Sequence, residues 1–290
     1  MAADLLANIY NAFEPNPLQP GDLPYVDCQA ARAQQDVATD LGRVIRRSQT
    51  LTQQLYTGYR GSGKTTELYQ LKRSLEEDGY QVIYWTVEEA MTRHAATFLL
   101  ALFNVLAAPQ DPVFEPGQRV LIVDNLDRIQ APLRADCCRN NYEVLFLDHA
   151  PQLKALNYHV IYTIPPALVY SRHATDLKDL YGSPNILLSV MAHQPNGIAH
   201  SCGLQCLKDI LRSRLPQDLP IRWVAKARQS THQIPLFESE DVLNRLGLMS
   251  GGQIRDLLHL MQWAINKTDE LPLQAEAIER AIAMLRDIYW

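Results

Sequence analysis

Residues 55–70 read LYTGYRGSGKTTELYQ, and this stretch decides the fold of the chain. Gly58, Gly63, Lys64 and Thr65 stand at the G-x-x-x-x-G-K-[ST] spacing of a phosphate-binding loop. Glycine allows backbone N–H groups to turn inward, and a helix that begins at Lys64 brings its unpaired N–H groups to the same point. Lys64 would neutralise the β and γ phosphates, and the Thr65 hydroxyl would bind Mg²⁺. The predicted nucleotide contacts are Gly58, Tyr59, Arg60, Gly61, Ser62, Gly63, Lys64, Thr65 and Thr66.

Predicted strands and helices alternate along the first two thirds of the chain. Strands are predicted at 53–57, 81–87, 119–125, 159–165 and 185–191, and helices at 3–13, 31–48, 89–108, 141–156 and from residue 64 onward. The stretch 119–125, RVLIVDN, has a continuous apolar run between its Arg and its Asp-Asn, which is typical of a central parallel strand covered on both faces. The pattern predicts an α/β fold with a doubly wound parallel sheet, the αβα sandwich of P-loop NTPases.

The last third of the chain has a different pattern. Four amphipathic stretches, at 203–215, 239–250, 251–267 and 273–289, predict helices with no strand between them. We therefore expect two domains, a nucleotide-binding α/β domain over 1–196 and a helical lid subdomain over 197–290, with a boundary near Pro195–Gly197.

Two carboxylates follow the apolar strand at 119–125. Asp124 ends that strand, where a P-loop fold directs an aspartate at Mg²⁺. The next residue is Asn125, although many P-loop ATPases carry their water-activating Glu at this position. Asp127 is the next carboxylate able to orient an attacking water; the alternative is that it pairs with Arg128 or caps a helix.

Two further polar residues are candidates for the same site. Thr163 stands near the carboxyl end of the next apolar strand, where ligands bind in such sheets. Its hydroxyl would contact the γ-phosphate or the attacking water. The alternative is that Thr163 is an ordinary strand threonine with no role in the site. Ser250 and the glycine pair after it suit the start of a helix that carries Arg255. Arg255 would reach the γ-phosphate from the lid, or be a solvated arginine.

Composition narrows the class of protein. The chain has 290 residues and a net charge of −5, which argues against broad affinity for nucleic acid. A local basic patch remains at Arg43, Arg46 and Arg47. There is no basic signal region, and the most apolar stretch, 96–108, is too short to span a membrane, so we expect a cytoplasmic protein. Five cysteines at irregular spacing fit reduced thiols, and a zinc site at Cys202, Cys206 and His200 lacks a second ligand cluster.

Four stretches together resemble motifs of the AAA-type ATPases. YTGYRGSGKTTEL resembles Walker A, LIVDNLDRI Walker B, HVIYTIPPALVYS the sensor 1 strand and SGGQIRDLLHL the sensor 2 of the lid. The likeness is to the branch that includes bacterial STAND-like signalling ATPases and origin-recognition initiators. LPYVDCQAAR (23–32) resembles the segment ahead of the P-loop, so residues 1–50 would close over the adenine, with Tyr25 and Val26 near the base. Asn125 departs from the family pattern and puts the rate of hydrolysis in doubt.

The resemblance implies Mg-ATP as ligand and slow ATP hydrolysis that controls assembly or signalling. It also implies a homo-oligomer in the ATP state, a separate effector or regulatory protein, and a trans-acting arginine, for which Arg172, Arg212 and Arg214 are candidates. Some relatives act in bacterial defence against phages. Two alternatives stay open: an ATP-dependent DNA-associated protein similar to initiators or transposition regulators, and a small-molecule phosphotransferase.

Overall fold

The computed structural model describes residues 2–22, 24–34, 36–87, 95–106, 114–128, 140–216, 219–224 and 233–289. The chain forms two compact units. The sheet unit comprises Asp36–Tyr59 and Lys64–Leu187, and the helical unit comprises Met1–Gln35, Arg60–Gly63 and Leu188–Trp290. This division differs from the predicted boundary at 196/197, because the first 35 residues lie with the helical unit and the return to that unit begins at Leu188.

Within the described ranges, the sheet unit is built on five parallel strands. They are β1 (Gln53–Gly58), β2 (Gln81–Thr86), β3 (Arg119–Asp124), β4 (His159–Ile164) and β5 (Asn185–Leu187), in the order β2-β3-β4-β1-β5. Because β1 lies between β4 and β5, its carboxyl end at Gly58 stands beside the ends of these two strands, and β3 follows on the far side of β4. The predicted α/β fold with a parallel sheet is confirmed.

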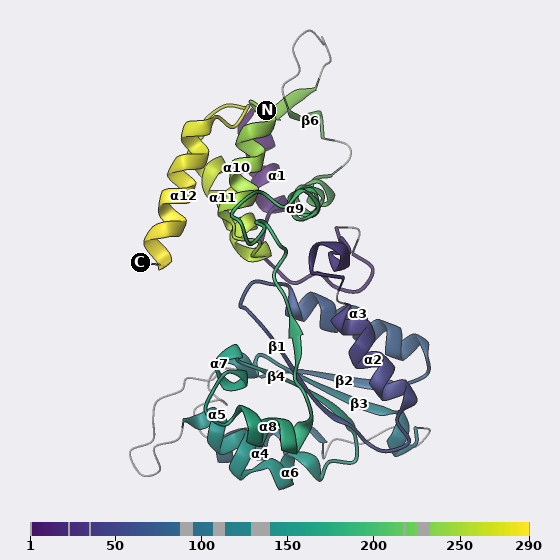
Figure 1. The fold of residues 1–290 in the computed structure, drawn as a ribbon. Helices are drawn as coiled ribbons and strands as arrows, with labels where there is room; N and C mark the ends of the chain where they lie inside the picture. The colour runs from purple at the N-terminus through teal and green to yellow at the C-terminus, as the bar shows by residue number, and fades with distance from the viewer. Residues whose placement is uncertain are drawn as a thin grey trace. The chain divides into compact units, whose positions relative to one another are not determined.

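Helices cover both faces of this sheet (Figure 1). One face packs against α2 (Val37–Arg47) and α3 (Lys64–Glu77), and the other packs against α4 (Ala95–Leu106), α6 (Ala150–Lys154) and α8 (Ala174–Tyr181). Successive residues of β3 divide between the two apolar cores: Val120 and Ile122 lie in the first, and Leu121 and Val123 in the second. A strand buried on both faces is apolar along its buried length, as β3 is from Val120 to Val123.

Three predicted elements differ from the structure. The helix predicted at 141–156 is broken into α5 (Asn141–Glu143), a π-helical stretch η5 (Val144–Asp148) and α6, because Pro151 has no N–H to continue the preceding turns. The helix predicted at 31–48 becomes a 3₁₀ turn, η1 (Gln29–Ala31), and α2, whose start is capped by Asp36 accepting from the Thr39 N–H. The strand predicted at 185–191 ends at Leu187. Residues 89–94 and 107–108 of another predicted helix lie outside the described residues.

The remaining short elements of the sheet unit lie in its connections. They are η3 (Pro116–Gln118), η4 (Leu126–Arg128) and α7 (Pro166–Val169). Of these, η4 follows β3 directly and carries Asp127.

In the part of the helical unit that the structure describes, five α-helices pack around one apolar core. They are α1 (Ala2–Ala12), α9 (Ser201–Arg214), α10 (Glu240–Met249), α11 (Ile254–Asn266) and α12 (Ala275–Tyr289), and the last four confirm the helices predicted after residue 197. Ile9 and Phe13 are fully buried in the same core as Leu257 and Met261, which explains why the N-terminal segment belongs to this unit. Two four-residue strands, β6 (Ile221–Val224) and β7 (Ile234–Phe237), pair in parallel and were not predicted.

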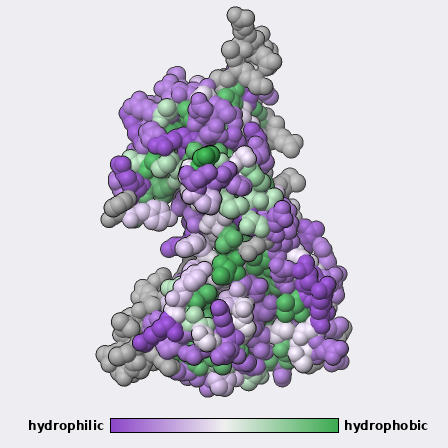
Figure 2. All heavy atoms as spheres, viewed as in Figure 1, coloured by the Kyte–Doolittle hydropathy of each residue, from purple (hydrophilic) through white to green (hydrophobic). Residues whose placement is uncertain are grey.

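Polar side chains predominate on the visible face of each unit (Figure 2). No helix in the described part of the chain is both long and apolar enough to cross a membrane. Within the same residues, no group of three or more His, Cys, Asp and Glu side chains is placed to hold a metal ion. Cys28, Cys202 and Cys206 are thiols, and Cys137 and Cys138 lie outside the described ranges.

Candidate functional site

The glycine-rich loop, Gly58–Thr65, connects β1 to α3. Two of its residues, Gly61 and Gly63, have positive φ angles, of +87° and +100°. This is the left-handed region, which glycine enters without the steric cost of a Cβ. Helix α3 begins at Lys64, so the unpaired N–H groups of its first turn and the positive end of its dipole lie at the loop.

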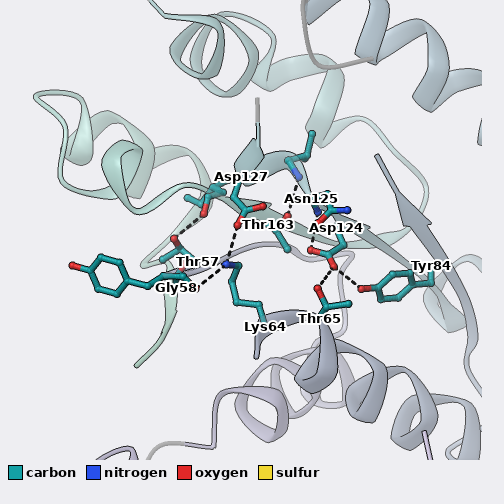
Figure 3. A network of polar contacts seen from close by, with 12 residues as sticks. Thr57, Gly58, Lys64, Thr65, Tyr84, Asp124, Asn125, Asp127 and Thr163 are labelled. Atoms are coloured by element: carbon teal, nitrogen blue, oxygen red, sulfur yellow. Dashed lines mark hydrogen bonds and ion pairs between the residues drawn. The ribbon is translucent and has the colours of Figure 1, made fainter. Parts of the chain in front are cut away.

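Lys64 is held by three oxygens at the start of α3 (Figure 3). Its Nζ donates to the carbonyls of Gly58, at 2.9 Å, and Tyr59, at 3.2 Å, and forms an ion pair of 2.8 Å with Asp127 Oδ2. The side chains of Lys64 and Asp127 are only 8% and 13% exposed. The sequence left Asp127 to orient a water, to pair with Arg128 or to cap a helix. The structure shows Asp127 in an ion pair, but its partner is Lys64 and not Arg128. The side chains of Tyr59 and Arg60 themselves are exposed.

Asp124 collects three hydrogen bonds at the end of β3. Its Oδ2 accepts from Thr65 Oγ1 and from Tyr84 Oη, each at 2.7 Å, and its Oδ1 accepts from the Asn125 N–H at 2.7 Å. The carboxylate is therefore fully paired in a residue that is 2% exposed. The predicted pair of Thr65 and Asp124 does meet in space (Figure 3).

This oxygen pair fits a magnesium ion. Adjacent ligands of an octahedral Mg²⁺ at about 2.1 Å lie about 3 Å apart, and Thr65 Oγ1 and Asp124 Oδ2 are separated by 2.7 Å. A hydroxyl and a carboxylate are also the hard oxygen donors that this ion prefers.

Tyr84 was not predicted as a site residue. It lies on β2, opposite Ile122 of β3, and its phenol reaches the carboxylate that ends the neighbouring strand. Burial raises the pKa of Tyr84 far above its usual value, and the negative charge of Asp124 and the hydrogen bond to it raise the pKa further. The phenol therefore stays protonated and donates. The aromatic content of QVIYWT was already explained by the strand, so the sequence held no separate signal for this contact.

Asn125 and Thr163 shape the turn between Asp124 and Asp127. Asn125 has a φ of +67°, which asparagine tolerates better than most residues with a Cβ. Thr163, fully buried on β4, accepts a hydrogen bond from the Leu126 N–H at 3.2 Å through its Oγ1. The hydroxyl thus holds the chain between Asp124 and Asp127, one residue ahead of Asp127.

The loop and the predicted sensor 2 turn meet within the helical unit. The Arg255 N–H, in the first turn of α11, donates to the Gly61 carbonyl at 3.1 Å. Gly251 and Gly252 have positive φ angles of +59° and +80° and turn the chain into α11. A Cβ on Gly61 would lie 2.9 Å from Arg255 Cβ, so this approach requires glycine in the loop.

Arg32 is a second residue that the sequence interpretation missed. It directly follows η1, is 3% exposed, and donates from its guanidinium Nη2 to the Ser62 carbonyl at 2.6 Å. Nothing in the spacing of the sequence links an arginine at position 32 to a loop 30 residues later. Tyr25 and Val26 lie in the partly buried segment ahead of Arg32 and remain predictions as base contacts.

The arginines proposed to act elsewhere have partners within the chain. Arg43 bonds Asp40 and Arg46 bonds Asp78. Among the candidates for a trans-acting residue, Arg212 pairs with Asp209 and Arg214 donates to the Glu14 carbonyl, while Arg172 donates to His173.

Comparisons with known proteins find similar folds among solved structures and no match by sequence. No protein-family model matches the chain, and a sequence comparison with curated proteins finds no match. Among solved structures, the chain is similar to the ORC2 protein of Aeropyrum pernix, solved as ADPNP–ADP complexes (TM-score 0.53, 13% identity, 94% of this chain and 71% of that chain). It is also similar to Cdc6p from Pyrobaculum aerophilum (TM-score 0.54, 14% identity, 93% and 69%) and to the ORC1 protein of A. pernix in complex with DNA (TM-score 0.53, 14% identity, 95% and 69%). At these identities the likeness is one of fold, and it extends over both units.

Proposed function

We propose that this chain binds Mg-ATP in the glycine-rich loop and hydrolyses the γ-phosphate, as an AAA-type ATPase. The observation that carries the proposal is the meeting of Lys64, Thr65, Asp124 and Asp127 at the carboxyl edge of the sheet, two of them ion-paired and two hydrogen-bonded. A buried lysine beside positive-φ glycines at a helix start is an anion site. The shared fold with a protein solved as ADPNP–ADP complexes supports an adenine nucleotide as that anion.

The residues divide the work as follows. Lys64, which is paired with Asp127, would exchange that carboxylate for the β and γ phosphates, and Thr65 and Asp124, which bond each other, would hold Mg²⁺. Bound Mg²⁺ would supply positive charge next to the phosphate oxygens. Asp127, released from Lys64, orients a water that attacks the γ-phosphorus; the bond to the β-phosphate oxygen breaks, and ADP, inorganic phosphate and a proton leave.

Hydrolysis by this arrangement is expected to be slow. Asn125 has no carboxylate to accept a proton, and the next acid along the chain, Asp127, is ion-paired with Lys64. Thr163 holds the Leu126 N–H, which fixes where Asp127 can point. A slow enzyme suits a nucleotide-controlled switch, so we propose that the ATP state favours a homo-oligomer and engages a separate effector. Arg255 would report the γ-phosphate, and the STAND-like branch and a role in bacterial defence are narrower forms of the same proposal.

A second candidate function is ATP-dependent association with DNA. It is favoured by the fold shared with an ORC1 protein that was solved in complex with DNA. Against it stand the net charge of −5 and the acidic partners of Arg43 and Arg46. Retention of duplex DNA that requires ATP and falls steeply with salt would favour this function, and no retention at low salt would exclude it.

The test of the main proposal is nucleotide binding and phosphate release by wild-type protein and Lys64→Ala. Wild-type protein should bind a fluorescent ATP analogue and release phosphate without any added acceptor substrate, which also separates an ATPase from a small-molecule kinase. Lys64→Ala should lose binding, whereas Lys72→Ala, which removes a lysine from the exposed pair with Glu76 on the same helix, should not. Light scattering with a slowly hydrolysed ATP analogue tests the oligomer. Equal binding by wild-type protein and Lys64→Ala would contradict the proposal.

A further inference from the structure

Two consecutive carbonyls of the glycine-rich loop are held from outside the loop. The Gly61 carbonyl accepts from the Arg255 N–H at 3.1 Å, and the Ser62 carbonyl accepts from the Arg32 guanidinium at 2.6 Å. All four residues belong to the helical unit, and Ser62 and Arg32 are both buried. Neither bond contributes to the Lys64, Asp124 and Asp127 network described above.

These two bonds decide where the next two amides point. In a trans peptide the C=O of one residue and the N–H of the next point in opposite directions. With the carbonyls of Gly61 and Ser62 turned to Arg255 and Arg32, the N–H groups of Ser62 and Gly63 face the other way. The positive φ angles of Gly61 and Gly63 are those of a concave run of N–H groups that receives an anion.

We propose that Arg32 is a positioning residue for phosphate binding, which sets the direction of the Gly63 N–H through the Ser62 carbonyl. This inference rests on the proposed function, because it names the residue that prepares the nucleotide site. Arg32 is suited to the task because its guanidinium is charged at every accessible pH and its planar fork holds a fixed direction. A bond from a charged donor to a buried carbonyl is also stronger than a neutral one.

A single segment anchors both of the groups that hold the loop. We call Ser189–Met191 the crossing segment. The Met191 N–H donates to the Ala31 carbonyl at 2.9 Å, directly before Arg32, and the Val190 N–H donates to the Gly252 carbonyl at 3.2 Å, three residues before Arg255. Gln253 Nε2 adds a bond to Ser189 Oγ at 2.9 Å.

The crossing segment packs closely against two glycines. A Cβ on Gly252 would lie 1.7 Å from the Val190 carbonyl oxygen, and a Cβ on Gly203 of α9 would lie 1.7 Å from that of Met191. The backbone therefore fits between these two glycines at closer range than any other residue would permit. Arg32 and the start of α11 are thus fixed relative to each other, and the two amides of the loop are set as a pair.

The inference is tested by competition binding with Arg32→Met and Arg32→Lys. Each variant is titrated with a fluorescent ADP analogue, and unlabelled ATP, ADP, tripolyphosphate and adenosine compete. Arg32→Met should weaken ATP, ADP and tripolyphosphate by the same factor, about tenfold, and leave adenosine unchanged, because only phosphate contacts depend on the loop amides. Arg32→Lys keeps a charged donor and should lose about threefold. Arg245→Met, which removes an arginine from the ion pair with Glu279 in the same unit, should bind as wild type.

The outcomes separate the two proposals. Folded Arg32→Met with wild-type affinity for ADP and tripolyphosphate would overturn the inference and leave the ATPase proposal standing. An equal loss for adenosine would overturn it as well, because it would show a general structural role. If Arg32→Met does not fold, Arg32→Lys decides, and unchanged phosphate affinity in that variant is the refuting result. Wild-type protein that binds no nucleotide would refute the proposed function itself.

Discussion

Replacement of Asp127 by asparagine should separate binding from hydrolysis, and the ion pair with Lys64 sets the size of the first effect. Asp127 is ion-paired with the Lys64 ammonium at 2.8 Å, so it would compete with a phosphate for that ammonium. Hydrogen bonds to charged groups contribute about 1.5–3 kcal/mol; the Lys64–Asp127 pair, with both partners charged, lies at the upper end, and a bond from Lys64 to neutral asparagine lies near the lower end. The difference, about 1 kcal/mol, predicts about fivefold tighter ATP binding.

The same substitution removes the carboxylate that orients the water. Phosphate release in a single turnover should therefore fall by about 10²-fold or more. Lys64 keeps the carbonyls of Gly58 and Tyr59, so the loop should stay folded. Asp176→Asn, in the exposed pair with His173, is the matched control and should change neither quantity. Weaker ATP binding together with wild-type phosphate release would refute both roles of Asp127.

Three further predictions concern stability, each measured by urea denaturation. Tyr84→Phe should lower the free energy of unfolding by about 2 kcal/mol, because the buried Asp124 carboxylate loses a hydrogen-bond donor. Tyr69→Phe is the control and should leave the free energy of unfolding unchanged. Equal stability of Tyr84→Phe and wild-type protein would contradict the predicted contribution of the Tyr84–Asp124 bond. Gly252→Ala should cost about 3 kcal/mol or more, against about 1 kcal/mol for Gly251→Ala, which shares the positive φ but meets no atom within 4 Å. Burial lowers the pKa of His159, so the unfolded chain binds the extra proton and stability should fall as the pH drops below about 6.5. His159→Asn should flatten that slope between about pH 7 and 5, and an unchanged slope would exclude His159 as its source.

The sequence predicted the sheet well because burial leaves a strong trace in it. Val120 to Val123 are apolar without interruption since alternate residues enter two different cores. The glycines and Lys64 follow from the chemistry of phosphate, so the loop could be predicted from spacing alone. Asp124 and Thr65 could be paired in advance because both stand at the same edge of a parallel sheet.

Other parts of the site could not be predicted, because they depend on tertiary contacts between distant segments. Arg32 and Tyr84 contact the site from segments whose sequence pattern predicts only a helix and a strand. The strand predicted through residue 191 ends at Leu187, because the backbone groups of Val190 and Met191 bond Gly252 and Ala31 instead of a neighbouring strand. The local sequence pattern cannot show which backbone groups, more than 60 residues away in the chain, Val190 and Met191 will bond.

The packing of α1 on α11 has a consequence for how the protein folds. Ile9 and Phe13 are buried in an apolar core that also contains Leu257 and Met261, which come about 250 residues later in the chain. In the sequence, the sheet unit comes between these two segments, and its two apolar cores consist of residues from the range 36–187 alone. During synthesis, therefore, the apolar face of α1 has no partner until α11 has been made. We expect the sheet unit to fold first and the helical unit to close last, as the slow, long-range step in assembly of the protein.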